Sequence, residues 1–310
     1  MRYYLGLDGG GTKTAACILD ESRRELGRGA GGPCNIATGA LDSLRDSVLT
    51  ATRQALDSAG LPPDTRFEAV CAGVAGYTAK RRRAEFTVLL SHSIPAIRHR
   101  LEPDFVIAWW GATEGKPGII VSAGTGAVVY GRNEEGESHR RDGRGFLLGD
   151  HGSAFDIGRQ ALWTTLYYLG EQPVTRPLAL AVLEEIGAVD ADDLIEWVYR
   201  DFSPARIAGL AALVGAHAST GDEDAVALIE SSARLLRTQA REVMNWLGLP
   251  QEVPIYGVGG LWNLGSTIKE PFCRESGELA PRWPAIELLE PAHDAAYGAA
   301  LLAMQADEDA

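Results

Sequence analysis

Near the start of the chain, two apolar runs flank a turn that is rich in glycine and threonine. The run Tyr3–Leu7 ends at Asp8, and Ala15–Leu19 follows the turn, which is the pattern of a β-hairpin. Consecutive glycines let backbone N–H groups approach an anion closely, because no Cβ intervenes. An aspartate at a strand end can hold Mg²⁺ directly or through water. The predicted anion and metal contacts are Asp8, Gly10, Gly11, Thr12 and Lys13, with Thr14 as a further hydroxyl donor.

A second turn of the same kind, AGTG at 123–126, lies between the strand-like runs Ile119–Ser122 and Ala127–Tyr130. One glycine cluster is also the tip of an ordinary tight hairpin, but two similar turns favour a polyphosphate held from opposite sides. A third segment, GVGG at 257–260, follows a strand and would let a flat base lie against bare backbone. Its alternative is a strand-to-helix turn that requires close packing. The residues predicted to contact the nucleotide here are Gly124, Thr125, Gly126, Gly259 and Gly260.

Composition narrows the classes of protein. A length of 310 residues favours two domains, and a net charge of −13 argues against a nucleic-acid or anionic-membrane partner. The four cysteines have no CxxC spacing, so neither a zinc site nor a disulfide framework is indicated. No segment resembles a signal peptide, and no apolar run is long enough to cross a membrane. We therefore expect a cytoplasmic protein.

The arrangement of the runs predicts an α/β fold with an approximate internal repeat. Its halves start near Tyr3 and Ile119, and each opens with strand, turn and strand before helices follow. We expect two domains across a central cleft: 1–117, completed by a C-terminal helix within 291–310, and 118–290. Helices are expected at 40–59, 80–91, 105–114, 291–304 and over most of 153–248, and further strands at 26–29, 67–74, 252–258 and 285–289. The segment 133–141 is expected to be a hairpin loop.

Taken in order, DGGGTKT, AGTGA and GVGGLWN resemble the two phosphate motifs and the adenosine motif of the sugar kinase–actin–heat-shock ATPase superfamily. More narrowly, the chain is similar to N-acetylglucosamine kinases and the BadF/BcrA-type ATPases. GGPCN at 31–35, GRGFLLGDHGS at 143–153 and YRDFSPARIAG at 199–209 match segments of that family. The resemblance implies two ribonuclease H-like, actin-like ATPase domains.

The resemblance also implies roles for single residues. Asp104 stands where the family has its catalytic base, although an aspartate there could equally cap the next helix, and Phe105 replaces a usual small residue. At the position of Arg144, animal enzymes carry Trp, whereas some bacterial relatives that prefer glucosamine carry Arg. The alternative interpretation is that Arg144 is a surface residue paired with Asp142 or Glu137. The implied sugar contacts are Asn35, Asp104, Gly126, Ala127, Gly143, Arg144 and Asp150, and Ala208 is an implied nucleotide contact.

The activity implied by the resemblance is ATP- and Mg²⁺-dependent phosphorylation of the 6-hydroxyl of N-acetylglucosamine or glucosamine. One alternative is an ATPase activator subunit of a radical reductase or dehydratase, which would hold an iron–sulfur cluster through paired cysteines. A second alternative is a non-catalytic sugar or nucleotide sensor of the same fold. A homodimer is implied by family likeness alone.

Overall fold

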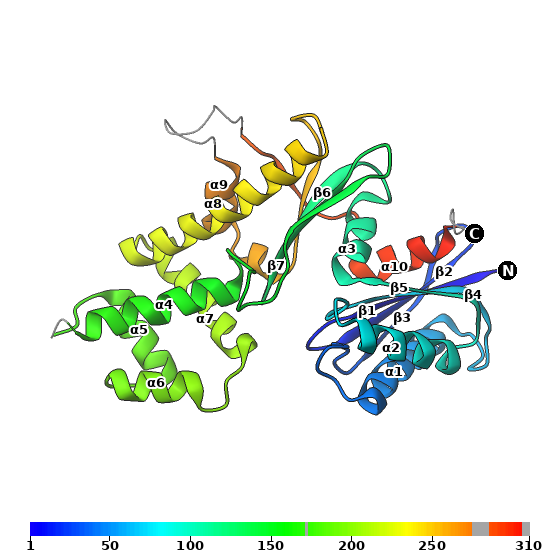
Figure 1. Ribbon diagram of the computed structural model, residues 1–310, viewed down its shortest axis with the longest axis horizontal. Coiled ribbons are helices and arrows are strands. Elements are labelled where there is room, and N and C mark those ends of the chain that lie inside the picture. The colour runs from blue at the N-terminus through cyan, green and yellow to red at the C-terminus, as the bar shows by residue number, and fades with distance from the viewer. Residues whose placement is uncertain (171–172, 275–284, 306–310) are drawn as a thin grey trace. The chain divides into compact units, whose positions relative to one another are not determined.

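The computed structural model describes residues 1–170, 173–274 and 285–305 (Figure 1). The chain divides into two compact units. Unit 1 consists of Met1–Lys116 together with the C-terminal segment from Pro291, and unit 2 is Pro117–Glu290. Positions 306–310 of the expected C-terminal segment lie outside the described residues.

Unit 1 is built on a five-stranded mixed sheet with the order β3-β2-β1-β4-β5. The strands are β1 (Tyr3–Gly9), β2 (Thr14–Asp20), β3 (Glu25–Gly31), β4 (Phe67–Val74) and β5 (Ala96–Pro103). β1, β2 and β3 are antiparallel neighbours, whereas β4 and β5 run parallel to β1. The carboxyl ends of β1, β4 and β5 therefore lie at one edge of the sheet, which is where ligands bind in open α/β sheets.

Helices cover both faces of this sheet (Figure 1). α1 (Leu41–Ala59) and α2 (Lys80–Ser93) cover one face, and α3 (Asp104–Thr113) and α10 (Ala295–Met304) cover the other. Alternation along β1 follows this layering, since Leu5 and Leu7 join the α1–α2 core while Tyr4 joins the α3–α10 core. Burying each such leucine contributes roughly 1.5–3 kcal/mol. α10 lies so close to β1 that a Cβ at Gly6 would be 2.1 Å from the Ala296 carbonyl oxygen.

Unit 2 repeats the strand order of unit 1, as β10-β9-β6-β7-β8. The strands are β6 (Gly118–Ala123), β7 (Ala127–Arg132), β8 (Ser138–Asp142), β9 (Ile255–Val258) and β10 (Leu288–Leu289). β6, β7 and β8 form an antiparallel meander, and β9 and β10 run parallel to β6. Both units thus have the ribonuclease H-like topology of actin-like ATPases, as the family resemblance implies.

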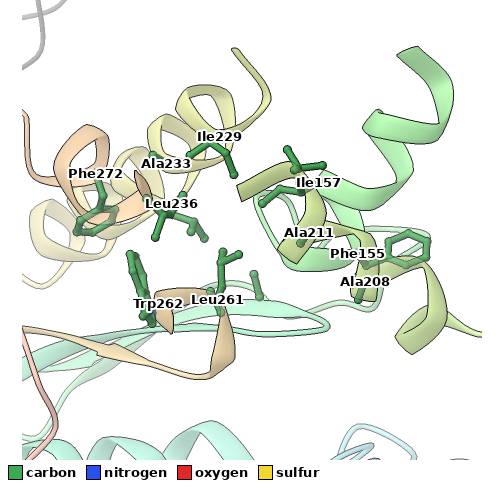
Figure 2. Packing of buried hydrophobic residues seen from close by; sticks show 14 of the residues in the cluster. Phe155, Ile157, Ala208, Ala211, Ile229, Ala233, Leu236, Leu261, Trp262 and Phe272 are labelled. Carbon is green, nitrogen blue, oxygen red and sulfur yellow. The ribbon is translucent and has the colours of Figure 1, made fainter. Parts of the chain in front are cut away.

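The helices of unit 2 are mostly inserted between β8 and β9. They are α4 (Ala154–Leu169), α5 (Pro177–Ile186), α6 (Ala191–Tyr199), α7 (Pro204–Ser219) and α8 (Glu223–Trp246), followed after β9 by the 3₁₀ helix η1 (Gly260–Leu264) and α9 (Ser266–Cys273). α8 presents Ile229, Ala233 and Leu236 at helical spacing to one hydrophobic core (Figure 2). The same core holds Trp262, whose Nε1 donates to the Val121 carbonyl at 2.9 Å. This bond fixes η1 against β6.

Two strands were missed or misassigned from the sequence. The segment 133–141 was expected to be a loop, but Ser138–Asp142 forms β8, and Ala96–Pro103 forms β5, which was not predicted. β5 and β8 each lie at the edge of a sheet and are hydrogen-bonded to one neighbouring strand. Such edge strands carry charged side chains without penalty, so the sequences SHRRD and AIRHRLEP lack the apolar alternation of a central strand. Within the described ranges, the helices are too short or too polar to cross a membrane.

Candidate functional site

The first glycine turn is the predicted hairpin between β1 and β2. Gly9 pairs with Thr14, and the Gly10 N–H donates to the Lys13 carbonyl at 3.0 Å. A Cβ at Gly11 would meet nothing within 4 Å, so its backbone borders open space, and Thr12 and Lys13 are exposed. An anion could therefore reach this backbone. Thr14 was wrongly expected to offer a hydroxyl to a ligand, because its side chain is buried and donates to the Gly32 carbonyl at 2.7 Å.

Three predicted polar residues gather at the carboxyl edge of the unit 1 sheet. Asp8 is near the end of β1, and Asp104 directly follows the end of β5. Asn35 forms a parallel bridge with Ala75, the residue that follows β4. Parallel strands bring these three positions, far apart in the sequence, to the same edge.

Asp8 is the most strongly perturbed of these residues. Burial raises its pKa to about 7, and the negative charges of Asp104 and Asp294 add to the effect, while Lys13 opposes it. Mg²⁺ characteristically binds one or two carboxylates and completes its shell with phosphate oxygens and water. The described residues contain no cluster of three or more His, Cys, Asp or Glu side chains that could hold a metal. Asp8 therefore fits a magnesium ion that arrives with a phosphate ligand.

Asp104 is the first residue of α3. Its Oδ1 accepts a hydrogen bond from the Phe105 N–H at 2.9 Å, which orients the carboxylate at the start of the helix. The N-terminal end of a helix also stabilises a negative charge. The N-cap position is held by Pro103, and the bond from the adjacent Phe105 N–H is not the bond that a capping aspartate accepts from the second or third helical N–H, so the capping alternative is wrong.

The side-chain amide of Asn35 has its oxygen fixed by a hydrogen bond, whereas its nitrogen is available to donate. Its Oδ1 accepts from the Ala37 N–H at 3.0 Å. A Cβ at Gly76, whose φ is +79°, would lie 2.5 Å from the same oxygen, so glycine is required beside it. Among the described residues, the Asn35 Nδ2 group has no hydrogen-bond acceptor. This amide is therefore a half-buried donor directed by its neighbours and suited to a hydroxyl acceptor.

In unit 2, the AGTG turn and the GVGG segment lie side by side, because β6 and β9 are parallel neighbours. A Cβ at Gly259 would be 2.4 Å from the Ala123 carbonyl oxygen, and one at Gly124 would be 3.9 Å from the Gly260 nitrogen. Gly259 therefore serves the close packing that the alternative interpretation expected. A Cβ at Gly260 would meet nothing within 4 Å, which leaves room for a ligand beside bare backbone. Thr125 is exposed at the tip of the turn.

Asp150 lies against the AGTG turn. A Cβ at Gly126 would be 2.6 Å from its Oδ2, and the Gly145 N–H donates to its Oδ1 at 3.2 Å. Burial raises the pKa of Asp150, and the charge of Asp142 adds to this effect. Gly143 is bound to the same region through its N–H, which donates to the Ala127 carbonyl at 2.9 Å. The structure thus brings together four of the implied sugar contacts of unit 2, which are Gly126, Ala127, Gly143 and Asp150.

Two predicted residues stand apart from these groups. Ala208 is buried in the hydrophobic core together with Phe155 and Ile157 (Figure 2), so its side chain is a packing contact in this structure. Arg144 is exposed, and no ion pair joins it to Asp142 or Glu137 within the described ranges. The alternative interpretation of Arg144 as the partner of either acid is therefore wrong. Whether Ala208 and Arg144 contact ligands stays a prediction.

The sequence analysis missed two acidic residues that influence the site. Asp294 caps α10, accepting from the Tyr297 N–H at 2.9 Å, and its charge helps to raise the pKa of Asp8. Asp142 accepts hydrogen bonds from the backbone of Asp150 and His151. Asp294 had a signal, since an aspartate before an alanine-rich helical run is a typical N-cap. Asp142 had only the weak signal of an aspartate before a glycine.

The fold and these edges define a class: an actin-like ATPase fold with a glycine-rich hairpin in each unit. The chain belongs to the BadF/BadG/BcrA/BcrD ATPase family, whose profile matches residues 5–303. It is 28% identical to an N-acetylmuramic acid/N-acetylglucosamine kinase of Clostridium acetobutylicum, covering 98% of both chains, and 31% identical to a glucosamine kinase of Vibrio cholerae, covering 75% of this chain and 77% of the other.

A solved structure resembles the whole chain. It is that of a Chromobacterium violaceum protein assigned as an N-acetylglucosamine kinase, with a TM-score of 0.80 and 28% sequence identity. The alignment covers 98% of this chain and 99% of the other. The likeness therefore extends over both units and is not restricted to the phosphate hairpins.

Proposed function

We propose that the chain is an amino-sugar kinase that transfers the γ-phosphoryl group of ATP to the 6-hydroxyl of N-acetylglucosamine or glucosamine. The observation that carries this proposal is the meeting of Asp8, Asn35 and Asp104 at one sheet edge beside the first phosphate hairpin. The named relatives, which are kinases of amino sugars, support the choice of acceptor.

The proposed mechanism assigns one task to each group. Asp104 accepts the proton of the attacking hydroxyl, which a base must take as the new O–P bond forms. Asn35 donates to a sugar hydroxyl through Nδ2, and Asp150 accepts from another. Backbone N–H groups of the two hairpins, with Thr12 and Thr125, donate to phosphate oxygens. Asp8 would hold Mg²⁺, which neutralises phosphate charge.

The cysteines favour a kinase over an activator of a radical enzyme. Iron–sulfur ligation requires accessible thiolates. Cys17, Cys34 and Cys71 are buried, and burial raises the pKa of Cys17 and Cys34 to about 12 and that of Cys71 further still. Cys273 is the remaining cysteine, and burial raises its pKa as well. These thiols have the environment of packing residues.

The proposal is tested by measuring ADP release with glucose, glucosamine, N-acetylglucosamine, N-acetylmannosamine and N-acetylmuramic acid. We expect an amino sugar to stimulate ADP release well above both glucose and the reaction without sugar. Equal release with and without every sugar would indicate an ATPase and would contradict the proposal. ATP binding without turnover on any sugar would indicate a sensor.

Thr125→Val is expected to weaken ATP binding by about ten- to a hundredfold while leaving sugar binding unchanged. The substitution keeps the shape of the side chain but removes a hydroxyl donor, and a hydrogen bond to a charged group contributes roughly 1.5–3 kcal/mol. Calorimetry with a non-hydrolysable ATP analogue measures the change. Thr238→Val is the matched control, because the Thr238 hydroxyl bonds within α8 to the Arg234 carbonyl. Unchanged ATP affinity in Thr125→Val would remove Thr125 from the phosphate site.

A further inference from the structure

The loop that carries Asp150 starts beside the AGTG turn. β8 ends at Asp142, which pairs with Val128 near the start of β7. The next residue, Gly143, donates its N–H to the Ala127 carbonyl at 2.9 Å. The first end of the loop is thus fixed by the sheet itself. At the second end, the Ala154 N–H donates to the Gly124 carbonyl at 2.8 Å, and the side chain of Asp142 holds the backbone of Asp150 and His151.

The Asp142 carboxylate joins both ends of the loop. Its Oδ1 accepts from the Asp150 N–H at 2.5 Å, and its Oδ2 accepts from the His151 N–H at 2.9 Å. His151 Nδ1 lies 2.8 Å from Oδ2, and Gln239 Nε2, on α8, donates to the same oxygen at 3.3 Å. Although burial opposes it, the backbone N–H groups of His151 and Asp150 lower the pKa of Asp142, so the acceptor is charged at neutral pH.

This carboxylate is enclosed by the loop. The Asp142 side chain is 6% exposed, whereas that of His151 is 60% exposed. A Cβ at Gly149 would lie 2.1 Å from Asp142 Oδ1, so the loop packs directly on the carboxylate. Asp142 and Asp150 both have left-handed backbones, with φ of 62° and 59°. Such conformations are costly for residues other than glycine and persist where surrounding contacts impose them.

We propose that Asp142 is a positioning residue for sugar binding. By holding the backbone of Asp150 and His151, it fixes the Asp150 carboxylate against Gly126. Asp142 itself is turned toward the loop backbone and acts only through Asp150. The inference rests on the proposed function for the identity of the ligand, whereas the restraint on the loop can be measured without any ligand.

Asp142→Gly removes the carboxylate, and glycine adopts the left-handed backbone without strain. We expect its KM for the amino sugar to rise at least tenfold, with the KM for ATP within twofold of the wild-type value. Asp142→Asn tolerates the same backbone conformation and keeps one of the two oxygen acceptors, because its Nδ2 cannot accept a hydrogen bond, so its sugar KM should lie between those of the wild type and Asp142→Gly. Glu242→Ala is the matched control, because Glu242 pairs with the adjacent Arg141 across the same β8–α8 contact. It should leave both KM values unchanged.

Amide hydrogen exchange provides the measurement that is independent of activity. Exchange of the Asp150 and His151 amides, which donate to the Asp142 carboxylate, should speed up at least tenfold in Asp142→Gly, less in Asp142→Asn, and stay at the wild-type rate in Glu242→Ala. Unchanged exchange in Asp142→Gly would overturn the proposal, and so would faster exchange with an unchanged sugar KM, or equal rises in both KM values. If the wild-type protein phosphorylates no sugar, the proposed function fails, and the exchange result alone then decides whether Asp142 holds the loop.

Discussion

Asp104→Asn is expected to lower kcat for sugar phosphorylation by 10²- to 10⁴-fold, which is the usual contribution of a general base. The amide cannot take the proton of the hydroxyl, but its oxygen can still accept the Phe105 N–H that Asp104 accepts at 2.9 Å. The start of α3 and the remaining sugar contacts should therefore persist. Steady-state kinetics measures the loss, and calorimetry with sugar should still detect binding.

The control for Asp104→Asn is Asp42→Asn, because Asp42 is also an aspartate in the first turn of a helix of unit 1. Asp42 lies on α1, outside the group formed by Asp8, Asn35 and Asp104. The kcat of Asp42→Asn should therefore equal that of the wild type. If Asp104→Asn keeps full turnover, Asp104 is not the base. If it loses sugar binding together with kcat, Asp104 serves mainly to hold the substrate.

Asp8→Asn is expected to stabilise the ligand-free protein and to lower activity at least 10²-fold. The pKa of Asp8 is raised from 3.8 to about 7, so between these values the folded state binds more protons than the unfolded state. Stability therefore falls as the pH rises from about 4 to 7, and the full penalty is present above pH 7. One pKa unit corresponds to about 1.4 kcal/mol, so removing the charge should raise the free energy of unfolding by about 2–4 kcal/mol at pH 8.

Denaturant unfolding without nucleotide or Mg²⁺, at pH 5 and pH 8, measures this gain. The gain should be larger at pH 8. Asp20→Asn is a control of opposite sign, because a hydrogen bond from the Ser22 hydroxyl, with further bonds from the Arg24 and Ser22 backbone, lowers the pKa of Asp20. Removing that charge should destabilise the protein at pH 8. A destabilised Asp8→Asn protein at pH 8 would show that the Asp8 carboxylate is held by favourable contacts and is not held ready for a cation.

The raised pKa of Asp8 also predicts how the Mg²⁺ concentration needed for activity changes with pH. A proton and Mg²⁺ compete for the Asp8 carboxylate, so the Mg²⁺ concentration for half-maximal activity should fall as the pH rises from 6 to 8. The fall should be steepest below pH 7, where the carboxylate is mostly protonated, and should level off above it. A half-maximal concentration that does not vary over this range would remove Asp8 from the metal site.

Much of the fold could be predicted because the local signals agreed with one another. The apolar runs at Tyr3–Leu7 and Ile119–Ser122 fall on the central strands β1 and β6, which are buried on both faces and so contain few polar residues. The glycine turns follow them directly, and the β1–β2 and β6–β7 hairpins form as expected. The edge strands β5 and β8 were not predicted, because burial does not impose an alternation of apolar and polar residues on them.

From the residues alone, the site was predictable where a residue is marked by its position after a strand, whereas Asn35, Asp104 and Asp150 were predicted from the family resemblance. Asp8 and the turn residues Gly10–Lys13 have that mark, and the structure places them at the sheet edge. Asp104 and Asn35 gather there through the parallel pairing of β1, β4 and β5, which no local pattern encodes. Asp142 could not be found, because its contacts depend on how the loop from 143 to 149 folds back on its carboxylate.

The most direct test of the central claim is phosphorus NMR of the product made from Mg-ATP and the amino sugar that best stimulates ADP release. The account predicts a phosphomonoester whose phosphorus signal is split by the pair of protons on carbon 6. A signal coupled to the anomeric proton would place the phosphate on the 1-hydroxyl and contradict the proposed acceptor. Signals of ADP and inorganic phosphate alone, with no phosphomonoester, would contradict the sugar kinase itself.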